Sequence, residues 1–422
     1  MAVLNPRPLT RLLALLACAA ACAVVAVPAA HGAKPAKKER SARAKARPAL
    51  PPLRDGEAEA RLLEVYRLVG QGQARAALAK AESLVQQHPN FQLAQLVYGD
   101  LLAAQARPLR ALGDVPEAPG TAGAQLAELR EESRLRIRAL QERPPAGTVP
   151  AQFLQLAPRS RHAIAVDTSR ARLYLFENTP GGLKLLADYY ISVGRFGTDK
   201  SAEGDLRTPL GIYYVTSNLD PKTLKDFYGA GALPINYPNP YDLRRGKTGG
   251  GIWLHGTPPT QFARAPKATD GCVVLANPDL ERIIRTVEVR TTPVVIAPSL
   301  RWVPQQALQA DAKDFTGALE GWRAARAAGD VVRLLSFYTP DAQAAGKPLA
   351  EALPQLRTEL ERVRGADVQL KDLSYLRWTD SADTMVVTFG EVPAGQRTGP
   401  VRRQYWVRTG TQWKIFYEGV IG

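Results

Sequence analysis

The chain has 422 residues, which exceeds the usual size of a domain with a single hydrophobic core, so two to four domains are expected. A hydrophobic content of 45% and a charged content of 23% exclude a chain that is disordered throughout. The formal net charge of +15 favours an anionic partner or surface.

The first 33 residues have the pattern of a secretory signal peptide. Arg7 and Arg11 precede an apolar run over residues 12–27, and small residues follow as far as Ala33. The pattern predicts export to the periplasm. An uncleaved membrane anchor is one alternative, and lipidation at Cys18 is another, although the apolar stretch before that cysteine is short. No later segment approaches the roughly 20 apolar residues that a membrane helix needs.

Residues 34–55 form a basic segment rich in Lys, Arg, Ala and Pro. Between residues 34 and 47, seven basic side chains accompany one acid, Glu39. Such a run predicts a disordered linker, and its charge suits docking to anionic envelope polymers. Nucleic acid is not predicted as a partner, because the sequence lacks zinc-ligand spacing, a helix-turn-helix signal and an RNA-binding aromatic motif.

Residues 56–145 are predicted to be helical. Apolar residues at helical spacing mark two faces, Leu62, Leu63, Tyr66 and Val69 on one and Leu78, Ala81, Leu84 and Val85 on the other. Gly72, Ala77 and Pro89 fall at spacings that resemble one tetratricopeptide repeat, with a partial second unit over residues 91–106. One repeat is fewer than such a stack needs, so we expect a small helical hairpin domain followed by an amphipathic helix over residues 125–142.

From His162 onward the apolar period changes to two. Seven short runs of this type, separated by Gly, Pro, Asn and Asp, predict a mostly-β domain over residues 158–300. Within it, residues 220–251 are rich in Gly, Pro, Tyr and Asn. This composition predicts a long ordered loop, a type of segment that is often functional.

Residues 305–422 predict a compact α+β domain, because helical patterns come first and four strand-like runs end the chain. Its aromatic residues are expected to form its core and pocket wall: Trp322, Tyr338, Trp378, Tyr405, Trp406, Trp413 and Phe416. No acid–base constellation indicates a second enzyme in this domain. Binding or self-association is its expected role.

Cys272 and His255 are the candidate catalytic residues of the sequence. Cys18 and Cys22 lie in the signal, so Cys272 is the single cysteine expected in the mature protein and has no intramolecular disulfide partner. His255 precedes it by 17 residues, and each lies beside a glycine at the end of a β-like run. A cysteine nucleophile needs a base for its proton and backbone donors for an oxyanion.

A structural role is the alternative for both residues, since an isolated buried cysteine and a core histidine beside Trp253 would give the same pattern. A zinc site is not predicted, because the sequence has no second cluster of Cys and His.

Three motifs resemble the YkuD-type L,D-transpeptidase catalytic domain: TPLGIY at residues 208–213, IWLHGT at 252–257 and TDGCVVL at 269–275. In that family a His-Gly pair is followed by Ser/Thr-X-Gly-Cys, and here His255 and Thr269 are 14 residues apart. The resemblance covers about a third of the chain. The C-terminal region in turn resembles the cone-shaped nuclear-transport-factor-like fold.

The first resemblance implies a cysteine enzyme that remodels peptidoglycan and so bears on cell shape. Cys272 would take the acyl group of a tetrapeptide stem, release D-alanine, and pass the acyl group to an amine of a second stem or of an envelope lipoprotein. His255 would be the base, oriented by the Gly256 carbonyl, and the amides of Gly271 and Cys272 would bind the oxyanion. No metal or organic cofactor is implied.

The loop over residues 227–242 resembles a lid or substrate wall of some relatives. The expected substrate contacts are Tyr228, Asn236, Tyr237, Trp253, Thr269 and Asp270. Six basic residues flank the predicted cleft and are read either as ligands for acidic stems or as solvated charges: Arg195, Lys200, Arg207, Arg244, Arg245 and Lys247.

Two positions depart from the family. Asp270 stands where relatives often have histidine, and Val274 stands where they often have an arginine that could engage a stem carboxylate. An acid within about 4–6 Å would raise the thiol pKa unless a Lys or Arg offset it; a turn residue bonded to its own backbone is the alternative for Asp270. Two other functions stay open: hydrolysis at the same site, which would release D-alanine or a wall-bound lipoprotein, and a decayed wall-binding scaffold.

Overall fold

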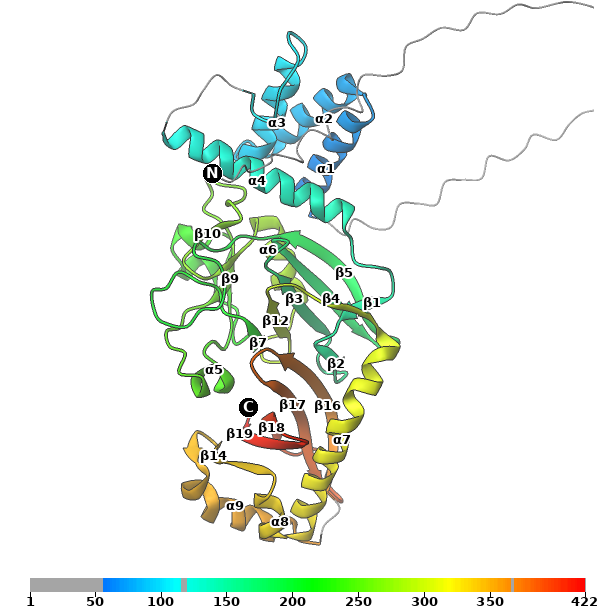
Figure 1. The fold of residues 1–422 in the computed structure, drawn as a ribbon, viewed down its shortest axis with the longest axis vertical. Coiled ribbons are helices and arrows are strands. Elements are labelled where there is room, and N and C mark those ends of the chain that lie inside the picture. Colours follow the sequence, from blue (N-terminus) through cyan, green and yellow to red (C-terminus); the bar gives the residue numbers. More distant parts are fainter. Residues whose placement is uncertain (1–55, 115–119, 366–367, 422) are drawn as a thin grey trace, which may run out of the picture. The chain divides into compact units, whose positions relative to one another are not determined.

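The computed structural model describes residues 56–114, 120–365 and 368–421 (Figure 1). All of them belong to one compact unit. The predicted signal peptide, residues 1–33, and the predicted linker, residues 34–55, lie outside the described residues. Within the described part, no helix combines the length and the apolar character that crossing a bilayer requires.

Four helices form the first region, which confirms the predicted helical region. They are α1 (Glu57–Gly70), α2 (Ala74–Gln87), α3 (Gln92–Ala103) and α4 (Thr121–Gln141). The predicted apolar face is wrong at Val69, which is 47% exposed. The buried stripe of α1 instead advances three residues at a time from Leu62 to Val65 and Leu68, and Val69 lies about 100° further round the helix.

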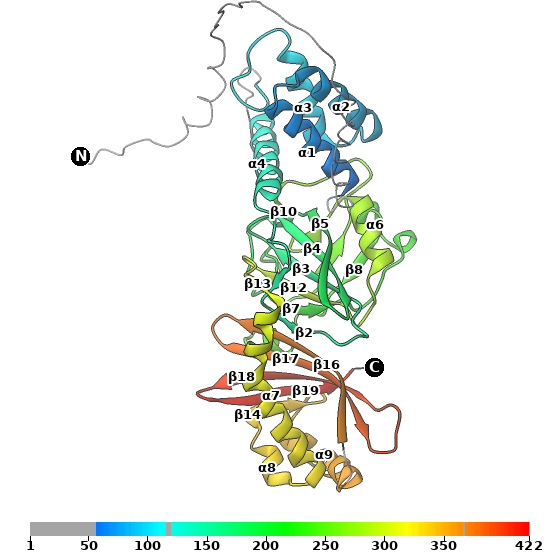
Figure 2. The same ribbon diagram turned by 90° about the vertical axis from the view of Figure 1, so that its right-hand side faces the viewer.

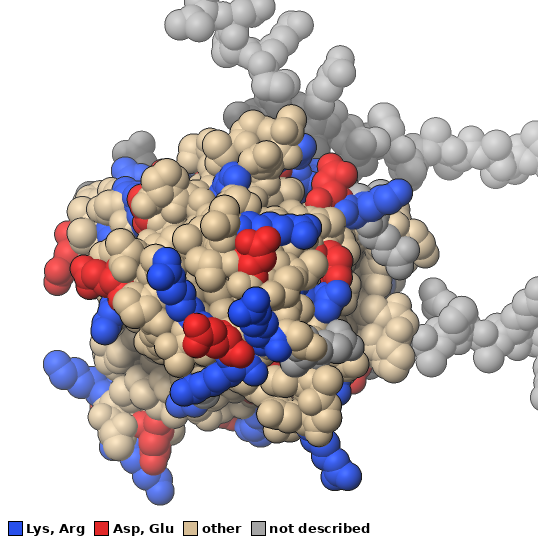
Figure 3. Space-filling model, turned by 90° about the horizontal axis from the view of Figure 1, so that it is seen from below, with Lys and Arg blue, Asp and Glu red and all other residues tan. Residues whose placement is uncertain are grey.

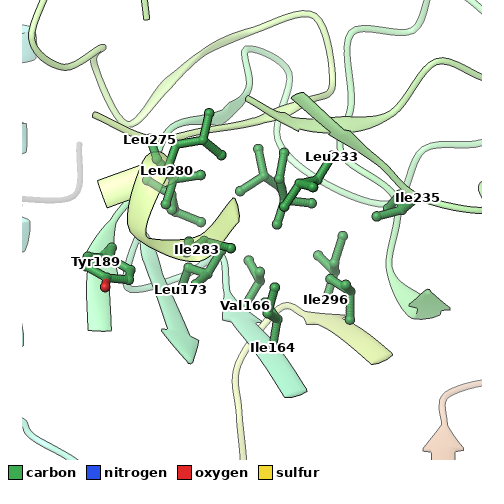
Figure 4. Close-up of a cluster of buried hydrophobic side chains, with 14 of the residues drawn as sticks. Ile164, Val166, Leu173, Tyr189, Leu233, Ile235, Leu275, Leu280, Ile283 and Ile296 are labelled. Carbon is green, nitrogen blue, oxygen red and sulfur yellow. The ribbon is translucent and has the colours of Figure 1, made fainter. Parts of the chain in front are cut away.

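The middle region is mostly β, as predicted, and is built on a five-stranded sheet with strand order β5-β4-β3-β12-β7. Its strands are β3 (His162–Asp167), β4 (Arg172–Thr179), β5 (Gly182–Tyr190), β7 (Gly211–Tyr214) and β12 (Pro293–Ala297). β3 and β12 pair in parallel, and the other neighbours are antiparallel. An aliphatic core lies between this sheet and α6 (Asn277–Thr286); Figure 4 shows Val166 and Ile296 of the sheet gathered with Ile283 of the helix.

A smaller sheet of order β11-β9-β8 carries the two motif residues. Its strands are β8 (Ala232–Pro234), β9 (Trp253–His255) and β11 (Val273–Val274), with β9 and β11 parallel. A further parallel pair joins β6 (Val193–Gly194) to β10 (Lys267–Thr269), and a bridge between Ser192 and Val274 connects this pair to the smaller sheet.

The prediction of one long loop over residues 220–251 is wrong in its detail. The segment contains η1 (Pro221–Thr223), η2 (Asp226–Tyr228), β8 and α5 (Pro240–Arg244). α5 begins at a capping box in which the Asn239 side chain accepts from the backbone of Tyr241 and Asp242. β8 forms because its partner β9 lies further along the chain, and local composition does not report such a pairing.

The third region is a seven-stranded sheet of order β15-β14-β19-β18-β17-β16-β2 with three helices (Figure 2). The strands are β2 (Phe153–Gln155), β14 (Tyr338–Ala344), β15 (Lys347–Pro348), β16 (Val368–Thr379), β17 (Asp383–Pro393), β18 (Val401–Thr409) and β19 (Gln412–Val420). The helices are α7 (Gln305–Ala328), α8 (Val331–Leu335) and α9 (Leu349–Val363). All seven aromatic residues predicted for this core are buried, and the α+β prediction is confirmed.

The two faces of the C-terminal sheet have different partners. Met385 and Val387 pack in a core with Trp322 of α7, whereas Val386 packs in a cluster with Phe176 of the middle region. The edge strand β2 (Phe153–Gln155) pairs with β16, and β1 (Thr148–Pro150) pairs with β13 (Trp302–Pro304). Residues 146–157 were included in no predicted domain; their strand β2 completes the C-terminal sheet, and β1 forms a separate two-stranded sheet with β13.

Candidate active site around Cys272

The turn that carries Cys272 stands beside the strand that carries His255. β11 and β9 pair so that Val273 lies opposite Leu254 and Val274 lies opposite His255. Side chains alternate along a strand, and partners in register project to the same face. Val274 and His255 therefore share a face, and Cys272 directly precedes β11, so the thiol and the imidazole are carried by two paired segments of the smaller sheet.

His255 is oriented by the backbone. Its side chain is 1% exposed, and its Nδ1 lies 2.7 Å from the carbonyl oxygen of Gly256. A carbonyl only accepts, so Nδ1 carries the hydrogen and Nε2 keeps a free lone pair. Burial lowers the pKa of His255 to about 4; the Gly256 hydrogen bond opposes this shift, and the charge of Arg264 adds to it. The imidazole is therefore neutral at physiological pH.

Aromatic rings pack around this imidazole. The Tyr228 and His255 ring centroids are 5.1 Å apart in an edge-on arrangement, and those of Phe227 and His255 are 5.7 Å apart. Tyr228 also contacts Trp253, with centroids 4.8 Å apart. The structure thus brings Tyr228 and Trp253, both predicted as substrate contacts, to the site, where they shield His255 from water.

The turn before Cys272 admits only glycine at position 271. Gly271 has a φ of +126°, and a β-carbon there would lie 2.7 Å from the Arg207 carbonyl oxygen. The Thr208 hydroxyl donates to the Gly271 carbonyl at 2.9 Å. The Thr269 hydroxyl donates to the Cys272 carbonyl at 2.7 Å and accepts the Gly271 N–H at 3.1 Å. Thr269, predicted as a substrate contact, thus stabilises the turn that carries Cys272.

The two predicted oxyanion donors differ in whether their N–H groups are already hydrogen-bonded. The Gly271 N–H is engaged by Thr269, whereas the Cys272 N–H has no hydrogen-bond partner in the part of the chain that the structure describes. The Cys272 amide is therefore the one of the two that is available to a ligand oxygen.

The Cys272 thiol is half-buried, and its Sγ donates to the Gly251 carbonyl at 3.5 Å. Burial raises the pKa of this thiol. A hydrogen bond from the Trp253 backbone and the charge of Arg264 act in the opposite direction, and Asp270 adds to the rise. At neutral pH the resting site thus holds a protonated thiol and a neutral base.

Asp270 is paired with an arginine. Its Oδ1 lies 2.7 Å from Nη2 of Arg195, and both side chains are more than half exposed. Asp270 is a lesser cause of the raised Cys272 pKa than burial. Among the described residues, we find this ion pair rather than the hydrogen bond to its own backbone that a turn aspartate would make.

Arg264 is a site residue that was not predicted. Its charge lowers the pKa of both Cys272 and His255, and its Cζ lies 4.4 Å from the ring centroid of Phe227. Its Nε is buried without a hydrogen-bond partner among the described residues. No sequence signal marks it, because it lies in an irregular segment between the two motifs.

The helical region holds the segment that leads to Arg264. The Phe262 ring stacks on Phe91, with centroids 4.3 Å apart. The Phe262 N–H donates to the Asn90 carbonyl at 3.1 Å, and Asn90 Nδ2 donates to the Pro259 carbonyl at 2.9 Å. The position of Arg264 at the site therefore depends on contacts with the connection between α2 and α3.

A cavity of about 490 Å³ lies next to this segment. The middle region contributes Arg195, Phe227 and Arg264 to its lining, and α4 contributes Glu128 and Glu132. Its volume is within the range of sites that hold small-molecule ligands. The cavity is therefore lined by charges of both signs, one of them Arg264, whose charge lowers the pKa of Cys272.

Asn277 is a second residue that was not predicted to serve the site. Its Oδ1 accepts from the amides of Ala230 and Thr257 at 2.9 and 3.1 Å, and its Nδ2 donates to the Thr257 carbonyl at 2.9 Å. A β-carbon on Gly256 would lie 2.0 Å from this Oδ1. Asn277 thus ties the loop after Tyr228 to the turn after His255; it ends the GCVVLAN run, which is its only sequence signal.

No group of three or more His, Cys, Asp and Glu side chains within the described residues is placed to hold a metal ion.

Comparison with known families assigns the middle region. Residues 161–296 match the YkuD family, which is described as the L,D-transpeptidase catalytic domain. The match runs from β3 to β12 and includes both His255 and Cys272. Residues 161–296 are an L,D-transpeptidase catalytic domain. None of the curated proteins compared with the chain matches it.

Solved structures extend the likeness beyond the L,D-transpeptidase domain. Bd1075 of Bdellovibrio bacteriovorus is 26% identical with a TM-score of 0.54, over 65% of this chain and 98% of that chain. The helical cell shape determining protein Pgp2 of Campylobacter jejuni is 23% identical with a TM-score of 0.49, over 61% and 91%. A protein of the NTF2-like family from Streptomyces avermitilis matches 26% of this chain and 95% of its own, with 19% identity and a TM-score of 0.21.

Two predicted substrate contacts of the L,D-transpeptidase domain have structural partners instead. The Asn236 side chain accepts from the Tyr214 N–H at 2.7 Å. Tyr237 is 5% exposed, and its hydroxyl donates to the Thr248 carbonyl at 3.1 Å. Asn236 thus ties the inserted segment to β7 of the main sheet, and Tyr237 bonds within that segment; their role as substrate contacts stays a prediction.

Of the six basic residues predicted around the cleft, Arg195 contacts the site through Asp270, and the others have partners elsewhere, although the charge of Lys200 also lowers the pKa of Cys272. Lys200 pairs with Asp205 at 2.8 Å, and Lys247 pairs with Asp199 at 3.0 Å. The remaining contacts are Arg207 with the Thr198 carbonyl, Arg244 with Asp341, and Arg245 with Asp380. Charge pattern alone did not separate these structural cations from the one at the site.

Proposed function

We propose that this protein forms an acyl-enzyme on Cys272 from a tetrapeptide stem of peptidoglycan and transfers the acyl group to an amine. One observation carries the proposal. Within an L,D-transpeptidase catalytic domain, a half-buried thiol directly precedes a strand that pairs with the strand of His255, a neutral imidazole with a free Nε2.

The proposed reaction has two acyl-transfer steps. In the first, His255 Nε2 accepts the thiol proton as Sγ attacks the stem carbonyl, and it then gives that proton to the departing amine of D-alanine. In the second, His255 accepts a proton from the acceptor amine, which attacks the thioester. The S–C bond breaks, and Cys272 regains its proton.

Three groups support the charge that develops in these steps. The available Cys272 N–H is a donor for the tetrahedral oxyanion. Arg264 favours the thiolate, since its charge lowers the Cys272 pKa. The Phe227 and Tyr228 rings keep water from His255, which maintains a low polarity around the reacting groups.

The cavity beside Arg264 supports an acceptor larger than water. It is lined by Arg195 and Arg264 on one side and Glu128 on the other. A peptide stem carries both carboxylates and an ammonium group, which these charges complement. We therefore assign the amine acceptor to this cavity.

Incubation of the purified protein with a carbapenem, followed by intact-mass measurement, tests the nucleophile. We expect one covalent adduct on the wild type and none on Cys272→Ala. An undiminished adduct on Cys272→Ala would show that another residue is acylated. No adduct on the wild type would favour the decayed scaffold.

A second experiment separates transfer from hydrolysis. Purified tetrapeptide muropeptides are incubated with an amine acceptor, and the products are resolved by liquid chromatography and mass spectrometry. Cross-linked stems are expected. If only shortened stems accumulate, the protein is a hydrolase that uses the same site.

We also propose that the protein acts in the periplasm and that residues 34–48 dock it to anionic envelope polymers, on the basis of the signal-like N-terminus and the basic run. Deletion of residues 34–48 should reduce binding to isolated cell walls at low salt; unchanged binding would contradict the docking role. Self-association through the C-terminal domain stays a prediction, to be checked by light scattering.

A further inference from the structure

A second cavity, of about 260 Å³, lies where the L,D-transpeptidase domain meets the C-terminal sheet. It does not include Cys272 or His255 in its lining. The polar residues that line it from the two sides include Arg159, Ser160, Tyr214, Ser374, Thr388 and Arg403.

Three of these residues form a row across the C-terminal sheet. Ser374 of β16 pairs with Thr388 of β17, which pairs with Arg403 of β18. The neighbours Tyr375 and Val387 belong to the core beneath α7. Because side chains alternate along a strand, the row faces away from that core and toward the L,D-transpeptidase domain.

The cavity brings together cations without acids. Arg159, Arg290 and Arg403 line it, whereas no Asp or Glu does. Arg403 is only 8% exposed; its Nε donates to the Thr388 hydroxyl at 3.0 Å, and its Cζ lies 3.3 Å from the Tyr214 ring centroid. Neither Arg159 nor Arg403 forms a salt bridge within the described residues.

A guanidinium without a salt bridge is unfavourable in this position, because burial removes water without supplying an opposite charge. Burial lowers the pKa of Arg159, the charge of Asp372 raises it, and the like charge of Arg403 lowers it again. Asp372 is exposed and is not part of the lining.

Hydrogen-bonding groups around the cavity are also unsatisfied. The Tyr214 hydroxyl, on a side chain that is 4% exposed, has no partner among the described residues. The same holds for Nη2 of Arg159 and the Thr291 hydroxyl. Buried polar groups are normally hydrogen-bonded, so these donors point to a ligand with acceptor oxygens.

We propose that this cavity binds a small organic carboxylate. The carboxylate oxygens pair with Arg159 and Arg403 and accept from the Tyr214 hydroxyl, and a short apolar body lies against the aliphatic wall formed by Leu156, Val289, Pro293, Val401 and Ile421. The volume admits a molecule smaller than most drug-sized ligands. Inorganic phosphate would leave the aliphatic wall unfilled. The site is separate from Cys272 and does not depend on the function proposed above.

Ligand-observed NMR titration of the full chain with 4-methylpentanoate tests the proposal. We expect saturable binding to the wild type and at least tenfold weaker binding of 4-methylpentanamide, which has the same shape without the charge. Inorganic phosphate is titrated in parallel. Equal binding of acid and amide, binding of phosphate alone, or no saturable binding would each overturn the proposal.

Variants locate the binding. Arg403→Met and Arg159→Gln should each weaken the carboxylate at least tenfold, whereas Arg362→Met, at an exposed position of α9, should leave its affinity unchanged. Without ligand, Arg403→Met should melt no lower than the wild type, because it removes an unpaired buried cation. If Arg403 has only a structural role, Arg403→Met should melt at a lower temperature than the wild type. In that case Arg159→Gln decides, because an unchanged carboxylate affinity in this variant would refute the site.

Discussion

At the scale of single residues, the reacting pair is neutral in its resting state. Burial disfavours the charged form of both side chains, so it raises the pKa of Cys272 and lowers that of His255. A preformed thiolate–imidazolium pair is therefore not the resting form. In the proposed reaction, proton transfer from Sγ to Nε2 would accompany attack, and groups that favour the thiolate, such as Arg264, would bear directly on the rate.

The first prediction concerns the pH dependence of stability. The pKa of His255 is about 4 in the folded protein and 6.5 when unperturbed, so the unfolded chain binds more protons between these values. Stability should rise with pH through this window, and His255 should account for about 3 kcal/mol of the unfolding free energy lost between pH 7 and pH 4. Urea denaturation at both pH values, compared with His255→Gln, measures this contribution; equal losses in the two proteins would contradict it.

The second prediction concerns the charges around the thiol. Arg264 lowers the pKa of Cys272 and Asp270 raises it. Arg264→Gln should therefore raise the thiol pKa and slow alkylation by iodoacetamide several-fold at pH 7, and Asp270→Asn should speed it. The alkylation rate as a function of pH gives both shifts. Shifts of the same sign in the two variants would contradict this assignment.

At the scale of elements, the irregular segment before Arg264 depends on the helical region. Phe262 is 6% exposed and stacks on Phe91, whereas Phe196 of the same domain is 62% exposed. A buried ring contributes far more to packing than an exposed one. The two phenylalanines therefore form a matched pair for testing whether the helices position the site.

The third prediction uses this pair. Phe262→Ala should lower the unfolding free energy by about 3 kcal/mol and slow carbapenem acylation of Cys272, because the segment that carries Arg264 loses its anchor. Phe196→Ala should change stability by less than about 0.5 kcal/mol and leave acylation unchanged. Chemical denaturation and intact-mass kinetics provide the two readouts. Normal acylation in a folded Phe262→Ala protein would show that the helices do not position the site.

At the scale of the whole molecule, a buried ion network joins α1 and α4 to the main sheet. Glu59 is 2% exposed and lies 2.8 Å from Arg172 of β4 and 2.9 Å from Arg136 of α4. Arg172 also pairs with Asp188, and Arg136 with Glu132. Burial alone would raise the pKa of Glu59, but the two arginines outweigh it and lower the pKa.

The fourth prediction follows from this network. Glu59→Gln removes the charge shared by two buried arginines and should lower the unfolding free energy by about 3–5 kcal/mol. Glu64→Gln, on the same helix, breaks an exposed pair with Arg67 and should cost at most about 1 kcal/mol. Urea denaturation compares the two variants. Similar small losses in both would mean that the network does not hold the regions together.

The net charge of the chain is unevenly distributed. Residues 1–55 hold ten Lys and Arg against two acids, so about half of the net charge of +15 lies in that segment. On the face of the molecule seen in Figure 3, basic and acidic side chains alternate over the surface. This distribution of charge is the reason for proposing residues 34–48, rather than that face, as the segment that docks to an anionic polymer.

Periodicity and local motifs predicted much of the fold. The period of two from His162, the helical faces and the final run of strands each reflect contacts within one element, and the structure confirms all three regions. The inserted segment was predicted less well, since β8 needs β9 as a partner and α5 needs the Asn239 cap. Local composition reports neither of these interactions.

Cys272, His255, Gly256 and Gly271 were visible in the sequence because the chemistry needs those residue types at a fixed short spacing in adjacent strands. The places of Arg264 and Asn277 at the site, and the structural roles of Asn236 and Tyr237, were decided by tertiary packing. The Phe91–Phe262 stack, the buried Glu59 network and the carboxylate cavity at Arg403 likewise join residues far apart in the chain. Only folding supplies those contacts, because their partners share neither an element nor a local repeat.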